Sequence, residues 1–257
     1  MYKQLMRVIA ICGFMMSSSA AFAQLNQYDE QGRKHGKWEE KNAYGQIKYE
    51  GTFDHGIPIG EFKHYYRHKK LKTKALYKDS AHVVYVEEYH KSGEVQAKGK
   101  YVEKQRDSTW VYFNPYGKKV KEEYYVQGEA DSLWKIFYSN TGAVFEEKQH
   151  KDGEAHGYWK QYFIDGTVKL SAQYKEGKLH GPYNLYYPSG DIQKEGDYEN
   201  GFREGIWLIY NEEGEVVKKV RYNKGFEKVI FNKMEKDEEA ERGELQEPKS
   251  PTNRIPE

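Results

Sequence analysis

Histidine is the first side chain to test for chemistry, because nine of the 257 residues are histidines. Imidazole nitrogens bind zinc and related ions when several ligands converge at a short spacing. His35, His156 and His180 instead each precede a glycine at the same point of a repeated pattern, so we expect them on different structural units. His64 and His68 are four residues apart, a spacing that does not bring two side chains together in an extended strand. The sequence predicts no metal site and no cofactor.

A nucleophile activated by a base is the second kind of chemistry to consider. The only cysteine, Cys12, lies in the N-terminal segment, and the rest of the chain contains no G-x-S-x-G turn. Acidic pairs such as Glu39 with Glu40 and Glu122 with Glu123 stand beside lysines, in the manner of solvated strand edges. We therefore expect a protein that is not an enzyme. The alternative is a catalytic site on a repeat scaffold that no local motif announces.

Residues 1–23 read as a secretory signal peptide. Lys3 and Arg7 precede an apolar run over residues 8–16, and the segment closes with Ala21-Phe22-Ala23. The run is shorter than the roughly 20 residues that span a bilayer. We predict cleavage after Ala23 and a periplasmic or secreted location; the alternative is an uncleaved N-terminal anchor.

Charge argues against several classes of partner. Removal of the two basic residues in the predicted signal peptide would lower the formal net charge from +1 to −1. A nearly neutral chain has no net field to attract nucleic acid, so we expect no nucleic-acid partner. Contact with a membrane or a glycan stays open but is not indicated by charge.

The secondary structure that positions the side chains can be predicted from an internal sequence repeat. Aromatic residues make up 16% of the chain, with 24 tyrosines and 24 glycines, a composition typical of strands and turns. When the sequence is aligned with itself every 24 residues, all the tryptophans fall at the same position of the repeat, here called the tryptophan column. One extra residue must be allowed between the third and the fourth tryptophan. Phe62, Val86 and Tyr183 fill the empty places, which gives eight repeats. The tryptophans are Trp38, Trp110, Trp134, Trp159 and Trp207.

Each repeat reads as a β-hairpin. In repeat six, residues 158–163 and 167–175 are predicted strands joined by a turn that ends at Gly166, and Gly190 takes the same place in repeat seven. A short loop ending in glycine suits a type I turn followed by a left-handed residue. The second strand alternates apolar and polar residues, as a half-buried strand does. We predict an all-β fold in which eight hairpins form one elongated, twisted antiparallel sheet of about sixteen strands.

Small residues recur in the second strand, at Gly51, Gly99, Ala172 and Gly196. We expect each to face the tryptophan-column residue of its own hairpin, whose ring would cover the gap. Repeats two and three depart most from the pattern, because Lys69 replaces the turn glycine and residues 81–84 lack the usual glycine. Those two repeats are expected to be distorted or shortened.

The pattern G-x-W-x-x-Y, G, G-x-Y-x-x-G resembles the MORN repeat. More narrowly, it is similar to the variant (MORN_2-type) repeats of bacterial proteins named as YwqK-like antitoxin components. The resemblance is best over residues 154–177 and 178–201. It implies an all-β scaffold that mediates protein contacts and, in some proteins, association with lipid or membrane.

Three segments follow: the signal peptide at 1–23, the repeat array at 24–225, and a C-terminal cap with a charged, disordered tail at 226–257. A second aromatic column, three residues after the tryptophan column, points to the opposite face and is the candidate contact surface. The alternative is a ladder of ring pairs that only stiffens the sheet. The candidate residues are Tyr65, Tyr89, Phe113, Phe137, Tyr162, Tyr186 and Tyr210.

The function expected from these features is an exported scaffold that binds another protein of the cell envelope. The first alternative is a carbohydrate-binding or cell-wall-binding array, in which repeated aromatic rings stack on sugars. The second is an antitoxin-like component of a toxin–antitoxin pair.

Overall fold

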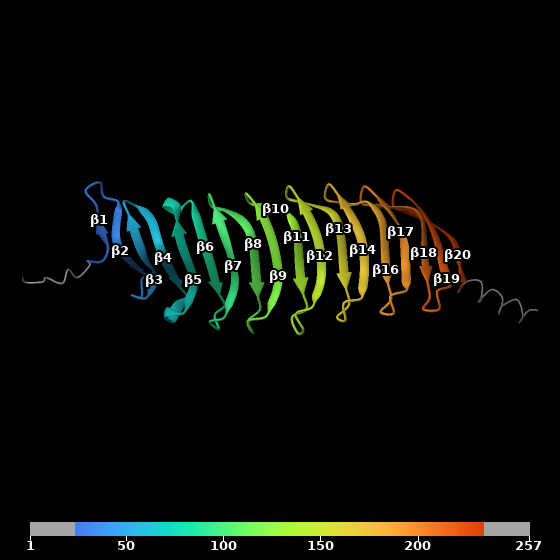
Figure 1. Ribbon diagram of the computed structural model, residues 1–257, viewed down its shortest axis with the longest axis horizontal. Coiled ribbons are helices and arrows are strands. Elements are labelled where there is room, and N and C mark those ends of the chain that lie inside the picture. Colours follow the sequence, from blue (N-terminus) through green and yellow to red (C-terminus); the bar gives the residue numbers. More distant parts are fainter. Residues whose placement is uncertain (1–23, 234–257) are drawn as a thin grey trace, which may run out of the picture.

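The computed structural model describes residues 24–233, which form one long, open antiparallel sheet (Figure 1). Apart from β10 with β11 and β15 with β16, strands that follow one another in the chain are hydrogen-bonded neighbours, so the sheet is a meander from β1 to β20. The strands are β1 (Gln27–Tyr28), β2 (Lys34–Lys41), β3 (Ile47–Asp54), β4 (Ile57–Tyr65), β5 (Leu71–Lys78), β6 (Val83–Tyr89), β7 (Val95–Val102), β8 (Gln105–Phe113), β9 (Lys119–Val126), β10 (Glu129–Ala130), β11 (Ser132–Phe137), β12 (Val144–Lys151), β13 (Glu154–Tyr162), β14 (Val168–Lys175), β15 (Lys178–Leu179), β16 (Gly181–Tyr186), β17 (Ile192–Glu199), β18 (Phe202–Tyr210), β19 (Val216–Asn223) and β20 (Phe226–Asn232).

The predicted all-β repeat array is confirmed. Two of the expected strands are interrupted, so β10 and β11 both pair with β9, and β15 and β16 both pair with β14. The two-residue strand β1 and the seven-residue strand β20 flank the array and complete the 20. The predicted signal peptide and most of the predicted tail lie outside the described residues. Across residues 24–233 there is no helix long and apolar enough to span a membrane.

The hairpin turns follow the glycine column. Gly166 has φ of 91° and donates its N–H to the carbonyl of Phe163, which is the left-handed turn position that glycine occupies without steric cost. In repeat five the equivalent Gly142 comes one residue later and bonds to Tyr138, so the extra residue lies in this turn, as the spacing predicts.

Repeats two and three depart from the regular turn. A 3₁₀ segment, η1 (Arg67–Lys69), replaces the glycine turn, and a second, η2 (Asp79–Ala81), replaces the usual closing turn. Non-glycine residues in both segments have positive φ, including Lys69 at 57°. The ladders β4–β5, β5–β6 and β6–β7 nevertheless stay in register, so the distortion is confined to the turns.

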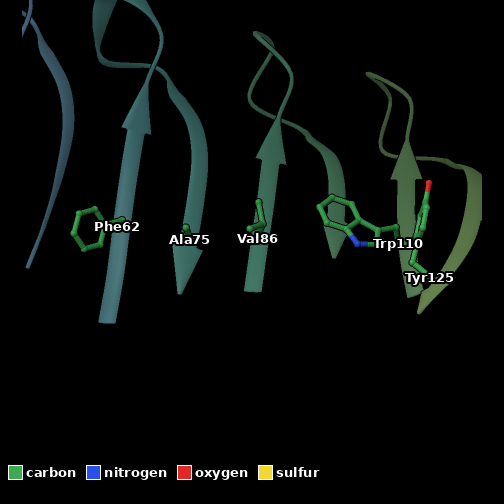
Figure 2. Packing of buried hydrophobic residues seen from close by; sticks show 5 residues of the cluster. All are labelled: Phe62, Ala75, Val86, Trp110 and Tyr125. Atoms are coloured by element: carbon green, nitrogen blue, oxygen red, sulfur yellow. The ribbon is translucent and has the colours of Figure 1, made fainter. Parts of the chain in front are cut away.

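The buried core lies on the face that carries the tryptophan column, here called the tryptophan face. One cluster joins Phe62, Ala75, Val86, Trp110 and Tyr125 on successive strands (Figure 2). A second cluster joins Trp207, Val220 and Tyr222 near the C-terminal end. The rings of Trp110 and Tyr101 meet edge to face with centroids 5.0 Å apart, the geometry that aromatic quadrupoles favour.

The ring that covers each small residue comes from the next repeat, which corrects the expectation of packing within one hairpin. Gly51 does pair with Trp38 in the ladder. A Cβ added at Gly51 would instead meet the ring of Phe62, and one added at Gly99 would meet Trp110. Gly196 and Trp207 repeat the arrangement. The core is therefore made of contacts between neighbouring repeats, as in other linear repeat proteins.

The segment after the array begins a further repeat. Strand β20 pairs along β19, and Phe231 in this strand stands 24 residues after Trp207, in the same column. Residues 226–232, after the array, thus form a strand. Phe226 and Ile230 remain exposed on β20.

Candidate binding face

The seven candidate residues occupy one structural position. Each is the last residue of the first long strand of its hairpin, and a β-bulge immediately precedes each of them. All are half-buried. Bulges re-aim side chains at strand ends, and alternation along each strand places these rings opposite the tryptophan column. We call this side of the sheet the tyrosine face. Its rings are Tyr65, Tyr89, Phe113, Phe137, Tyr162, Tyr186 and Tyr210.

Carboxylates hold several of these rings in place. The hydroxyl of Tyr162 donates to Glu147 at 2.9 Å and that of Tyr210 to Glu195 at 2.6 Å, in both cases a glutamate of the preceding repeat. Burial, reinforced by Glu147, raises the pKa of Tyr162 to about 12. The hydrogen bond to Glu195, reinforced by burial, raises the pKa of Tyr210 to about 12. These tyrosines stay neutral at physiological pH and link successive hairpins.

The same arrangement recurs near the N-terminal end with one variation. Tyr65 donates to Glu50 of the preceding repeat at 2.5 Å, whereas Tyr89 donates to Glu87 of its own strand at 2.8 Å. Phe137 has no hydroxyl, and the ammonium of Lys119 lies 4.2 Å from the centre of its ring, within cation–π range. The row therefore combines apolar ring area with fixed charges, a mixture suited to protein recognition.

A hollow of about 600 Å³ lies on the tyrosine face beside Tyr89. Its apolar lining comes from Leu76, Tyr85 and Val111. Tyr85 lies on the same face of β6 as Tyr89, and its side chain is 47% exposed. Three lysines stand around these residues: Lys74, Lys98 and Lys100. We call this feature the lysine-rimmed hollow.

Sequence reasoning missed the lysine-rimmed hollow. One indication was available, because Leu76 occupies a column in which Thr52, Lys100 and Asp197 are polar. A single exposed apolar residue is common on a protein surface, but several of them side by side indicate a contact site. The apolar neighbours Tyr85 and Val111 come from two other strands, β6 and β8, and the sequence does not reveal that they meet.

A second hollow lies on the tryptophan face, where the tryptophan column contains a residue without an aromatic ring. Val86 stands in the tryptophan column and packs with Ala75, but it fills less space than an indole. A hollow of about 670 Å³ remains, and its lining includes Tyr77 and Tyr101. Figure 2 shows the small side chains of Ala75 and Val86 between the rings of Phe62 and Trp110.

Glu123 corrects the expectation of solvated acidic pairs, because its side chain is only 4% exposed. It stands in the column of Gly99 and accepts hydrogen bonds from Tyr112 at 2.7 Å and Tyr125 at 2.8 Å. Lys121 forms an ion pair with it as well. Burial opposes ionisation, but these partners together hold the pKa of Glu123 below its usual value of 4.5. The carboxylate is buried because donors on both sides satisfy it.

His35, His156 and His180 fall on different repeats, as expected, but His35 has a second histidine beside it. Among the described residues, one group of three side chains offers metal-ligand atoms within 4.8 Å of one another: His35, Asp54 and His55. His64 and His68 are not part of it.

The MORN repeat variant family matches three segments of the chain, residues 58–79, 179–200 and 203–224. These segments coincide with repeats two, seven and eight of the array described above. No curated protein matches this chain. The matches show that the chain contains MORN-type repeats, a kind of repeat that suggests a scaffold for protein or membrane contacts.

Proposed function

We propose that this protein is an exported, non-enzymatic repeat scaffold whose tyrosine face binds another protein of the cell envelope. The observation that carries the proposal is the lysine-rimmed hollow, because it places exposed apolar area on the tyrosine face. Glu87 of its lining accepts a hydrogen bond from Tyr89 of the aromatic row. Within residues 24–233, helical segments do not cover this face, since η1 and η2 are single turns at the sheet margin. Export rests on the character of residues 1–23.

The chemistry of the hollow defines the partner. An apolar side chain would pack on Leu76, Tyr85 and Val111, and carboxylates around it would meet the lysine ammonium groups. All three lysines already form ion pairs, so an acidic partner group would compete with contacts that the protein makes by itself. The pairs are Lys74 with Glu61 at 3.0 Å, Lys98 with Glu87 at 3.0 Å and Lys100 with Asp107 at 2.9 Å. Exposed ion pairs of this kind are weak and exchange readily. We infer a partner segment with an apolar anchor flanked by Asp or Glu.

Site-directed photocrosslinking tests this proposal in intact cells. A photoreactive amino acid at position 85 is expected to give a discrete protein adduct, whereas one at position 116 is not, although Tyr116 is 88% exposed at a turn. Leu76→Ser should reduce the adduct about tenfold through loss of the apolar lining. Ile136→Ser is the matched control, because Ile136 is equally exposed (36%) but lies on the tryptophan face.

A second variant tests the aromatic row itself. Replacement of Tyr162, Tyr186 and Tyr210 together by alanine should weaken the adduct while circular dichroism shows that the sheet persists. Equal adducts at positions 85 and 116, or an adduct that Leu76→Ser leaves unchanged, would refute binding at this face. Loss of all protein adducts together with binding that free sugars block would instead favour a carbohydrate-binding array.

A further inference from the structure

Two histidines and an aspartate meet at the N-terminal end of the array, away from the lysine-rimmed hollow. His35 lies at the start of β2, Asp54 is the last residue of β3, and His55 follows it in the turn between β3 and β4. The Nδ1 of His35 is 3.6 Å from Oδ1 of Asp54, and the Nε2 of His55 is 3.7 Å from the same oxygen. The two rings lie side by side with centroids 4.8 Å apart.

Two of the three donor separations are close to those of a tetrahedral coordination sphere. With ligand bonds of about 2.0–2.1 Å, the donor atoms of a tetrahedral zinc ion are about 3.3–3.4 Å apart. Two donor pairs of the cluster are within a few tenths of an ångström of that value, and the third lies within 4.8 Å. The Nδ1 of His35 accepts a long hydrogen bond, 3.5 Å, from the backbone N–H of His55, so its lone pair points toward the turn and a bound ion would replace this bond.

A carboxylate outside the donor set orients His55. Asp29, whose side chain is 7% exposed, accepts the Nδ1 proton of His55 at 2.7 Å. The tautomer with its proton on Nδ1 satisfies this short contact to the carboxylate and leaves the lone pair of Nε2 available, which is how a carboxylate prepares a ligating histidine. Arg33 lies 3.0 Å from the same Nδ1 but directs its Nε to Asp29 at 2.7 Å, so one carboxylate offsets its charge.

We propose that His35, Asp54 and His55 bind one divalent transition-metal ion of the zinc type. Two neutral imidazoles and one carboxylate are a donor set that suits such an ion, and water can take the fourth position. The ion would join β2 to the β3–β4 turn, with Asp29 on the loop before β2 as the orienting residue. It would stabilise the first repeat, which has only the short strand β1 on its outer side.

Repeat seven provides an internal comparison. His180 stands in the column of His35 and lies 3.7 Å from Glu199, so this repeat has the first two kinds of donor. Asn200 stands where His55 does, and both residues have positive φ, 52° and 46°. Asparagine tolerates this backbone region better than most residues. His55→Asn therefore converts the first turn to a form that the chain already uses, and removes the third donor.

The test measures zinc uptake by the full chain, prepared without a polyhistidine tag, using calorimetry and the visible spectrum of Co²⁺. We expect one ion per chain, at least tenfold weaker binding in His55→Asn and His35→Gln, and the absorption of four-coordinate cobalt only where the site is intact. His156→Gln is the matched control, because it removes a histidine of the same column in repeat six and should leave binding unchanged.

Zinc should also raise the melting temperature of the wild type and of His156→Gln but not of His55→Asn. If His55→Asn binds zinc as the wild type does, or if the wild type binds no more zinc than that variant, the site is refuted. His35→Gln decides the question should His55→Asn fail to fold, since glutamine at position 35 leaves the turn intact.

Discussion

At the scale of single residues, a glycine and an indole share one space. A Cβ at Gly99 would overlap the ring of Trp110, and Gly99 does not have the left-handed backbone that only glycine favours. Position 99 therefore requires glycine for a steric reason, because the ring of Trp110 in the next repeat leaves no room for a Cβ. One repeat earlier, Ala75 and Val86 occupy the same pair of positions. There the residue in the glycine position is larger and the residue in the tryptophan position is smaller.

This pairing predicts a compensating double substitution. Gly99→Ala should cost about 1–3 kcal/mol of unfolding free energy through overpacking, and Trp110→Val about 2–4 kcal/mol through the cavity it leaves. The double variant should lose at least ~1 kcal/mol less than the sum, because alanine then occupies part of that cavity. Urea unfolding of the four proteins measures the difference. Strict additivity would show that the two side chains do not share the space.

Glu123 shows why some residues escaped prediction at this scale. In sequence it belongs to an acidic pair beside lysines, which is typical of a solvated strand. Its burial depends on hydroxyl groups of Tyr112 and Tyr125 that reach it across β8 and β9. Local patterns do not report such partners. Tyr125 belongs to a column that is mostly aromatic, and Tyr112 to one whose other members are Glu, His, Gln, Ile or Leu, so neither column points to Glu123. His35 and His55 escaped for the same cause, since 20 residues separate them in the chain.

At the scale of the element, the hairpin was predictable because two periods agree. Aromatic columns set the strands and glycine columns set the turns, and both repeat every 24 residues. The extra residue of repeat five was predicted in the turn that contains Gly142 and is found there. Which repeat supplies the ring over Gly51 was predicted wrongly. Trp38 and Phe62 stand on the two strands that flank this residue, so sequence spacing favours neither.

The irregular turn of repeat two gives a prediction for this element. Lys69 takes the place of the turn glycine with φ of 57°, a conformation that is strained for a residue with a Cβ. Lys69→Gly should raise the unfolding free energy by up to about 1 kcal/mol through relief of that strain. Lys70→Gly is the control, because Lys70 is extended (φ −75°, ψ 130°), and glycine there should be neutral or destabilising. A lower urea midpoint for Lys69→Gly than for Lys70→Gly would contradict this account.

At the scale of the whole molecule, two buried clusters are separated by a less well packed middle. Trp110 and Trp207 are each 1% exposed, but Trp134 and Trp159 between them are only half-buried. His150 stands where the other repeats place Phe or Tyr, and burial lowers its pKa. The Nδ1 of His150 and the Nε1 of Trp159 are buried without a hydrogen-bond partner among the described residues. Unsatisfied buried groups of this kind weaken a junction.

Hydrogen-exchange rates should therefore differ between the middle of the array and its two ends. Amides of β11 to β13 are expected to open at lower denaturant concentration than those of β4 to β8 or β18 and β19, because repeat arrays unfold by local units. His150→Tyr restores the aromatic column and should slow exchange in the middle by about tenfold, which is about 1.4 kcal/mol, with little change at either end. Uniform protection along the chain, unchanged by His150→Tyr, would show that the sheet unfolds as one unit.

The packing of each ring on the preceding repeat gives the array a polarity that matters while the chain is being made. Synthesis at about 5–20 residues per second adds one 24-residue repeat in about 1–5 s, whereas a hairpin closes within microseconds. A newly formed repeat therefore waits for seconds with its small residue uncovered, until the next aromatic side chain arrives and packs over it. Assembly from the amino end thus leaves a single unfinished surface at the growing tip, while every earlier junction is already closed.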